Sequence, residues 1–242
     1  HYVDGTEYIV HARDDINMQM TAMKARFTDY TAYAETKFKD AFLKDEIKDA
    51  YVLKCETFSS MYIENKGNGK FDMKPLPIGA QLSPIYGMYS TDINADGNMD
   101  VICVGNSFAP EVQTGRNDAQ GMLVLEGNGQ GGFAVNRNEY NLTSDNKAIS
   151  CLQTVDGYPL YLVSSNSGRL KAFKAKLKST SVTLADTDVY AVIKFKNGKS
   201  SKYEFQFGNS YLSQSSRKIF ISPQVKAMTI YSVSGTKREL LF

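Results

Sequence analysis

The chain has 242 residues, of which 42% are hydrophobic and 22% are charged, and its formal net charge is +2. This balance is typical of a globular protein with one or two domains. The sequence lacks the clustered basic residues of a nucleic-acid surface and has no apolar run long enough to span a membrane. It begins with His1 and shows no secretion signal, so we expect a processed protein or part of a longer one.

Residues 1–49 have the pattern of a small helical segment. Ile16, Met20, Met23 and Phe27 recur at helical spacing, and acidic residues precede them at the positive end of the helix dipole. We expect this methionine-rich face to be core packing rather than a cofactor site.

From about residue 50 onward the pattern changes to short strands bounded by Gly, Asn and Asp, with no helical pattern between them. We therefore expect a mainly β protein with antiparallel sheets over residues 50–178 and a separate small β module over residues 179–242. The Asn197-Gly198 pair is the strongest hairpin signal in the chain. The runs expected as strands are YVLKCETF, SMYIEN, MDVICVGN, GMLVLEGN, ISCLQTV, LYLVSSN and LKAFKAKL, followed in the tail by VYAVIKF, KYEFQF, RKIFISP, AMTIYSV and KRELLF.

Cysteine is sparse, and no pair of cysteines has the spacing of metal ligands. Cys55, Cys103 and Cys151 each lie in a strand-like run, so we expect three buried thiols that pack as small hydrophobic groups. A disulfide between two of them is the alternative.

The most informative stretch is DINADGNMD, residues 92–100, which we call the acidic loop. Acidic or amide side chains occupy its positions one, three, five and nine, and Gly97 occupies the sixth. Calcium prefers several oxygen ligands in such a compact loop, with a glycine at the sharp bend. The expected ligands are Asp92, Asn94, Asp96, Asn98 and Asp100.

Cys103 occupies position twelve, where an EF-hand has its bidentate glutamate, and the residues around it read as a buried strand. The acidic loop therefore leads into a strand rather than a helix. The alternative to a calcium site is a turn in which the same side chains only accept hydrogen bonds from backbone N–H groups.

The β region contains an internal repeat. YIENKGNGKF and VLEGNGQGGF share a strand, a glycine-rich turn and a phenylalanine, and Gly67 and Gly129 are 62 residues apart. In a weaker third copy Asp156-Gly157 corresponds to Asp96-Gly97, but Leu152 and Leu160 replace the first and last ligands. We expect this third loop to hold no ion. Repeated units of this length are typical of β-propeller blades.

These motifs resemble those of the FG-GAP/VCBS repeat family. DINADGNMDVICVGN matches the family's calcium loop and strand, and residues 65–71 match its N-x-G-x-G-x-F hairpin, whereas Gly127 stands where the family has Asn. The tail segment GNSYLSQSSRKIFI, residues 208–221, resembles the ASPIC/UnbV module that follows such repeats. The helical segment resembles an insertion in large bacterial members of the group.

The resemblance implies calcium-stabilised propeller blades in secreted or cell-surface bacterial proteins that serve adhesion or ligand binding, and it implies no reaction. Two or three blades cannot close a propeller, so we expect a partial propeller. The implied partners are the remainder of a longer polypeptide or another surface protein or glycan.

A long polar connection, residues 106–121, offers a second candidate site. Glu111, Arg116, Asn117 and Asp118 are candidates for a ligand-binding patch, because long loops in compact β domains tend to carry function. The alternative is a solvated loop, or one that supplies further oxygens to the ion.

We expect no catalytic residues, because His1 and His11 are the only histidines and no hydrolase or nucleotide-binding motif is present. Two other functions remain open. A carbohydrate-active enzyme could use carboxylates such as Glu111, Asp118 and Glu126, since such pairs leave no readable spacing. The chain could also be purely structural and bind the rest of its own polypeptide.

Overall fold

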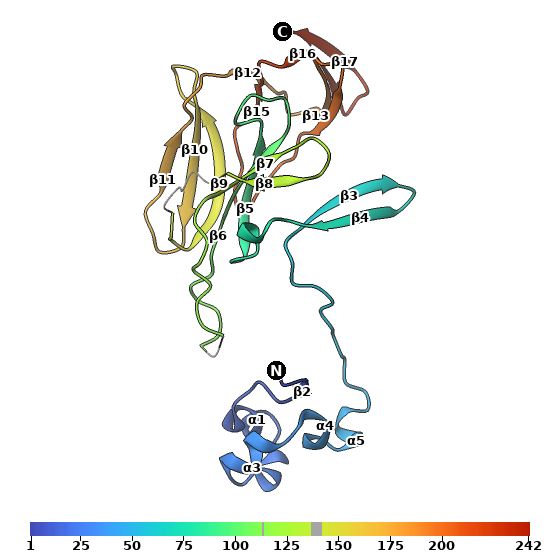
Figure 1. Ribbon diagram of the computed structural model, residues 1–242, viewed down its shortest axis with the longest axis vertical. Coiled ribbons are helices and arrows are strands. Elements are labelled where there is room, and N and C mark those ends of the chain that lie inside the picture. The colour runs from blue at the N-terminus through green and yellow to red at the C-terminus, as the bar shows by residue number, and fades with distance from the viewer. Residues whose placement is uncertain (113, 137–141) are drawn as a thin grey trace. The chain divides into compact units, whose positions relative to one another are not determined.

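The computed structural model describes residues 1–112, 114–136 and 142–242 (Figure 1). It is mainly β, with 42% strand and 12% helix, and every strand pair in the described residues is antiparallel. The predicted fold class is confirmed to this extent, and the described residues form several small sheets rather than a closed propeller. The chain forms two compact units, residues 1–57 and residues 58–242. None of the helices described is long and apolar enough to cross a membrane.

The first unit consists of a short strand pair and five short helices. The apolar residues predicted to share one helix lie in two helices, because the backbone is extended at Met20 and ends the first one there. Met23, Phe27 and Ala41 are buried together with Ile16, which confirms that the methionine-rich face is core. The elements are β1 (Tyr2–Val3), β2 (Thr6–Glu7), α1 (Arg13–Gln19), α2 (Met23–Arg26), α3 (Tyr30–Glu35), α4 (Phe38–Ala41) and α5 (Lys44–Ile47).

Residues 51–58 form no helix or strand, so the strand predicted for YVLKCETF is wrong. Tyr51 and Phe58 are 88% and 91% exposed, and Cys55 is exposed rather than buried. A strand is stable only when a neighbour takes up its backbone hydrogen bonds, and no strand of the described chain pairs with this run. Cys103 and Cys151 are buried free thiols, as predicted.

The second unit begins with the hairpin β3 (Met61–Gly67) and β4 (Lys70–Pro75), followed by a short 3-10 turn (Ile78–Ala80). A four-stranded sheet follows, with β5 (Ile85–Thr91), β6 (Asp100–Gly105), β7 (Leu123–Gly127) and β8 (Phe133–Val135) in chain order. Next comes a three-stranded sheet of β9 (Asn146–Gln153), β10 (Pro159–Ser165) and β11 (Lys171–Lys174).

The tail forms two further sheets with their own core around Met228 and Ile230. One sheet pairs β12 (Thr180–Thr183) with β15 (Lys218–Ile221). The other has the order β14 (Ser200–Glu204), β13 (Asp188–Phe195), β16 (Val225–Ser232) and β17 (Lys237–Leu241). The predicted hairpin at Asn197-Gly198 is confirmed between β13 and β14, with Gly198 at a φ of +84°.

One hydrophobic core joins the four-stranded and three-stranded sheets. Ile102 and Val124 of the first sheet pack with Ile149 and Val163 of the second. Strands β5 and β9 approach closely at Gly87, where a Cβ would lie 3.0 Å from the backbone nitrogen of Ile149. This core holds in place β5 and β6, the two strands that the acidic loop connects.

Candidate functional site

The acidic loop connects β5 to β6, whose last pairing is Thr91 with Asp100. Its bend passes through Ala95 and Gly97, with φ values of +62° and +86°. A left-handed conformation costs little at glycine, which explains the residue at position six. A Cβ at Gly97 would also come within 3.3 Å of the Gln224 side chain, which places the β15–β16 turn against the loop.

The acidic side chains fold onto the backbone of their own loop. The two carboxylate oxygens of Asp92 accept hydrogen bonds from the backbone N–H groups of Asp96 (3.1 Å) and Gly97 (2.9 Å). Asn94 Oδ1 accepts from Asp96 N–H at 3.0 Å, and Asp96 Oδ1 accepts from Asn98 N–H at 2.7 Å. The first, third and fifth positions therefore all turn toward the same tight bend.

Asp100 has a different place, because it is fully buried at the start of β6. Its carboxylate accepts hydrogen bonds from the backbone N–H groups of Ile93 and Gly127, both at 2.9 Å. Burial raises the pKa of Asp100, the two N–H groups oppose that shift, and the charges of Asp96 and Asp92 add to it. Asp100 thus ties the acidic loop to β7, and the charges of Asp96 and Asp92 disfavour the ionised form of Asp100.

The second glycine-rich hairpin, between β7 and β8, packs against the acidic loop. A Cβ on Gly127 would lie 2.2 Å from the carbonyl oxygen of Met99, so only glycine fits at this position. A Cβ on Gly129 would lie 2.4 Å from Asn98 Oδ1. The glycine at position 127 therefore follows from the close approach of the two turns.

The donor set of the loop suits a hard cation, because it offers only oxygen atoms and each oxygen that accepts one N–H keeps a second lone pair. Across the described parts of the chain, no three His, Cys, Asp or Glu side chains form a group that could hold a metal ion. The amide oxygens of Asn94 and Asn98 would therefore have to contribute. Position nine of such loops often acts through water, which suits the buried, hydrogen-bonded Asp100.

The third copy of the loop is built differently. Asp156 lies in the turn between β9 and β10, where the Nζ of Lys174 lies 2.7 Å from its carboxylate. This hydrogen bond is the main reason that the pKa of Asp156 falls to about 2. Asp156, which corresponds to Asp96, is therefore paired with the ammonium group of a lysine of the same chain.

The predicted ligand patch lies on the connection between β6 and β7, where Ser107 pairs with Asn117. The guanidinium of Arg116 lies over the Phe108 ring at 4.0 Å, and Glu111 and Asp118 are exposed. Within the described residues no hydrogen bond or ion pair joins Glu111, Arg116 and Asp118. Glu126 lies apart on β7, where it accepts a hydrogen bond from the Asn136 amide at 2.6 Å.

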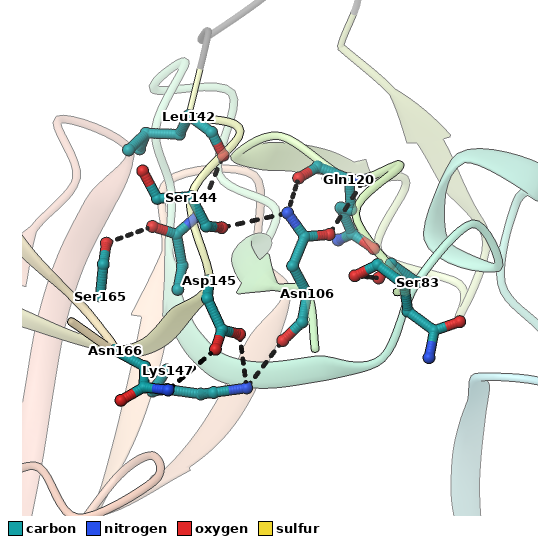
Figure 2. Close-up of polar contacts among 11 residues, drawn as sticks. Ser83, Asn106, Gln120, Leu142, Ser144, Asp145, Lys147, Ser165 and Asn166 are labelled. Atoms are coloured by element: carbon teal, nitrogen blue, oxygen red, sulfur yellow. Dashed lines mark hydrogen bonds and ion pairs between the residues drawn. The ribbon is translucent and has the colours of Figure 1, made fainter. Parts of the chain in front are cut away.

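A buried polar cluster that the sequence patterns did not predict lies just after the end of β6 and at the start of β9 (Figure 2). The Asn106 amide group donates to the carbonyls of Gln120 (2.7 Å) and Ser144 (3.1 Å), and its oxygen accepts from Gln120 N–H (3.0 Å). Beside it, Lys147 Nζ binds the Asn106 carbonyl at 2.8 Å and the Asp145 carboxylate at 2.7 Å.

The internal repeat carries a signal for this cluster. Asn106 and Asn166 follow corresponding strands, β6 and β10. Each donates its backbone N–H to the carbonyl of the residue just before the first strand of its own copy, Pro84 or Asp145. Because the Asn106 side chain and Lys147 bond backbone and side-chain groups from both sheets, the cluster fastens the two sheets together.

A scan against protein-family models finds no family that matches the chain, and a search of curated proteins finds no matching relative. The residues of the acidic loop and their geometry therefore carry the functional proposal.

Proposed function

We propose that residues 58–242 form a calcium-stabilised, non-catalytic binding or scaffold module of the FG-GAP/VCBS kind. In this proposal β5–β8 and β9–β11 are propeller-like blades, and residues 179–242 are an ASPIC/UnbV-like module. The module belongs to a secreted or cell-surface protein, and its partner is a longer polypeptide, another surface protein or a glycan.

The observation that carries the calcium proposal is the arrangement of the acidic loop. The side chains of Asp92, Asn94 and Asp96 turn toward one bend, and Asp100 is buried directly behind it. The neighbouring carboxylates of Asp92, Asp96 and Asp100 repel one another. A divalent cation would offset that repulsion and fix the start of β6. Residues 92, 94, 96 and 98 would contribute oxygens directly, and Asp100 would contribute directly or through water.

Calcium should raise the melting temperature of the protein. A concentration about 100 times the dissociation constant adds about 2.7 kcal/mol, which corresponds to roughly 5–10 °C for a unit of this size. Asp96→Ala should abolish the rise, as measured by differential scanning calorimetry with calcium and with EDTA.

Asp156→Ala is the matched control, since Asp156 occupies the corresponding position of the third copy and is paired with Lys174. This variant should keep the calcium response. An unchanged melting temperature in the wild-type protein would favour the alternative, a turn closed only by its own backbone hydrogen bonds.

A further inference from the structure

A cavity of about 670 Å³ opens beside the acidic loop, within the size range of small-molecule sites. Its walls come from the four-stranded sheet, from β10 and β11, and from the end of β15.

The inner wall of the cavity is apolar. Ile102 and Val124 belong to the buried core, and Tyr161 and Phe173 lie beside them. The exposed Leu177 continues this surface to the mouth. This apolar wall suits the hydrocarbon body of a ligand.

One side of the cavity is positively charged. Lys174, Lys176 and Lys178 alternate along β11 and the residues after it, and all three line the cavity. Lys174 is paired with Asp156, and Lys178 lies 5.5 Å from the Tyr158 ring. Lys176 has no hydrogen bond, ion pair or ring contact among the described residues, so its ammonium group is free to meet an anion.

Two carboxylates also line the cavity, fewer than its three lysines, and both accept hydrogen bonds. Asp92 accepts backbone N–H groups of the acidic loop, and Glu126 accepts the amide of Asn136. We propose that this cavity binds an amphipathic anion of the fatty-acid type, with its chain on the apolar wall and its carboxylate at Lys176. The cavity adjoins the acidic loop, since Asp92 and Asn94 also line it, but the anion proposal does not rest on a bound calcium ion.

Dodecanoate is a suitable probe. Its binding to the full chain can be measured by isothermal titration calorimetry at concentrations below those at which dodecanoate forms micelles. It should bind, and dodecylamine, which has the same chain and the opposite charge, should bind roughly tenfold more weakly. Lys176→Glu should weaken dodecanoate binding about three- to tenfold and leave the neutral dodecanol unaffected. Lys199→Glu reverses a lysine that does not line the cavity and should change neither.

Ala175→Phe tests the location, because Ala175 lines the cavity and packs against the core. The larger side chain should remove binding of both dodecanoate and dodecanol, with folding checked by circular dichroism. Unchanged binding in a folded Ala175→Phe protein would overturn the site, and equal binding of dodecylamine or an inert Lys176→Glu would overturn the anion preference. Binding that persists in Asp96→Ala would separate this site from the calcium loop.

Discussion

At the scale of single residues, the second unit is tied together by a few buried polar side chains. Asn106 is fully buried and has a φ of +93°, a conformation that asparagine tolerates better than most residues. Its side chain satisfies three backbone groups from two other segments. Gln120 is its neighbour and is 2% exposed, but neither polar atom of its side chain has a partner among the described residues.

These neighbours should respond to mutation in opposite directions. Asn106→Ala should lower the free energy of unfolding by about 2–4 kcal/mol, because it leaves several buried backbone groups without partners. Gln120→Met should raise it by about 1 kcal/mol, because it removes an amide whose burial is uncompensated. Urea unfolding at neutral pH measures both values. A stabilising Asn106→Ala or a strongly destabilising Gln120→Met would contradict this account of the cluster.

At the scale of elements, strand ends are held by side chains from distant parts of the chain. Asp188 begins β13 and is 1% exposed. Its carboxylate accepts hydrogen bonds from Arg238 of β17, at 2.7 and 2.5 Å, and from the Ala185 N–H at 2.8 Å. These contacts, chiefly the one with Arg238, lower the pKa of Asp188 despite the cost of burial.

Because the folded-state pKa of Asp188 lies below its ordinary value, the unfolded chain binds its proton more tightly. The stabilising contribution is therefore complete above about pH 4 and is lost as the pH falls through the folded-state pKa. Asp188→Asn should cost about 1–2 kcal/mol at pH 7, a value reduced by the partial exposure of Arg238, and much less near pH 2. Urea unfolding at several pH values tests this difference.

Glu204→Gln is a useful control, since Glu204 pairs with Lys202 on the exposed face of β14. Exposed pairs contribute little, so this variant should show little change at any pH. A cost of Asp188→Asn that stayed constant down to pH 2 would contradict the assignment to the ionised carboxylate.

Serine side chains also cover the free edge of β9. Ser210 and Ser213 place their hydroxyl groups on the backbone of Ile149, and Ser215 and Ser216 do the same at Cys151. Edge strands expose backbone groups that invite pairing with other chains. The serine-rich segment therefore covers an edge that no strand occupies.

At the scale of the whole molecule, the chain consists of two compact units with separate cores. Residues 51–57 between the last helix and β3 have no regular structure, and Lys54 is exposed. Limited trypsin digestion should cut first at Lys54, since protease sites concentrate in exposed irregular segments. Mass spectrometry should identify a stable fragment beginning at Cys55.

That fragment should retain the calcium-dependent rise in melting temperature, because the acidic loop and all its contacts lie within residues 58–242. First cleavage inside the sheets, or rapid loss of the larger fragment, would contradict the division into two units.

Much of the β architecture could be predicted from local patterns. The strands around Ile102, Val124 and Ile149 and the Asn197-Gly198 hairpin all follow from short runs of apolar residues and strong turn signals. Strand β5 was not among the expected runs, because Gly87 weakens its local pattern. That glycine is present for the close approach to β9, which is a tertiary cause.

The sequence by itself determined the mainly β class, the helical start, the repeat and the oxygen-rich acidic loop, because each depends on residues that are near one another in the chain. Only the tertiary structure decided that residues 51–58 lack a partner strand, that Asp100 binds Gly127, and that Asn106 fastens two sheets. It also decided where the lysine-lined cavity lies. The contacts in the buried cluster join residues that are 14 to 41 positions apart. No local pattern encodes which distant backbone group a side chain will meet.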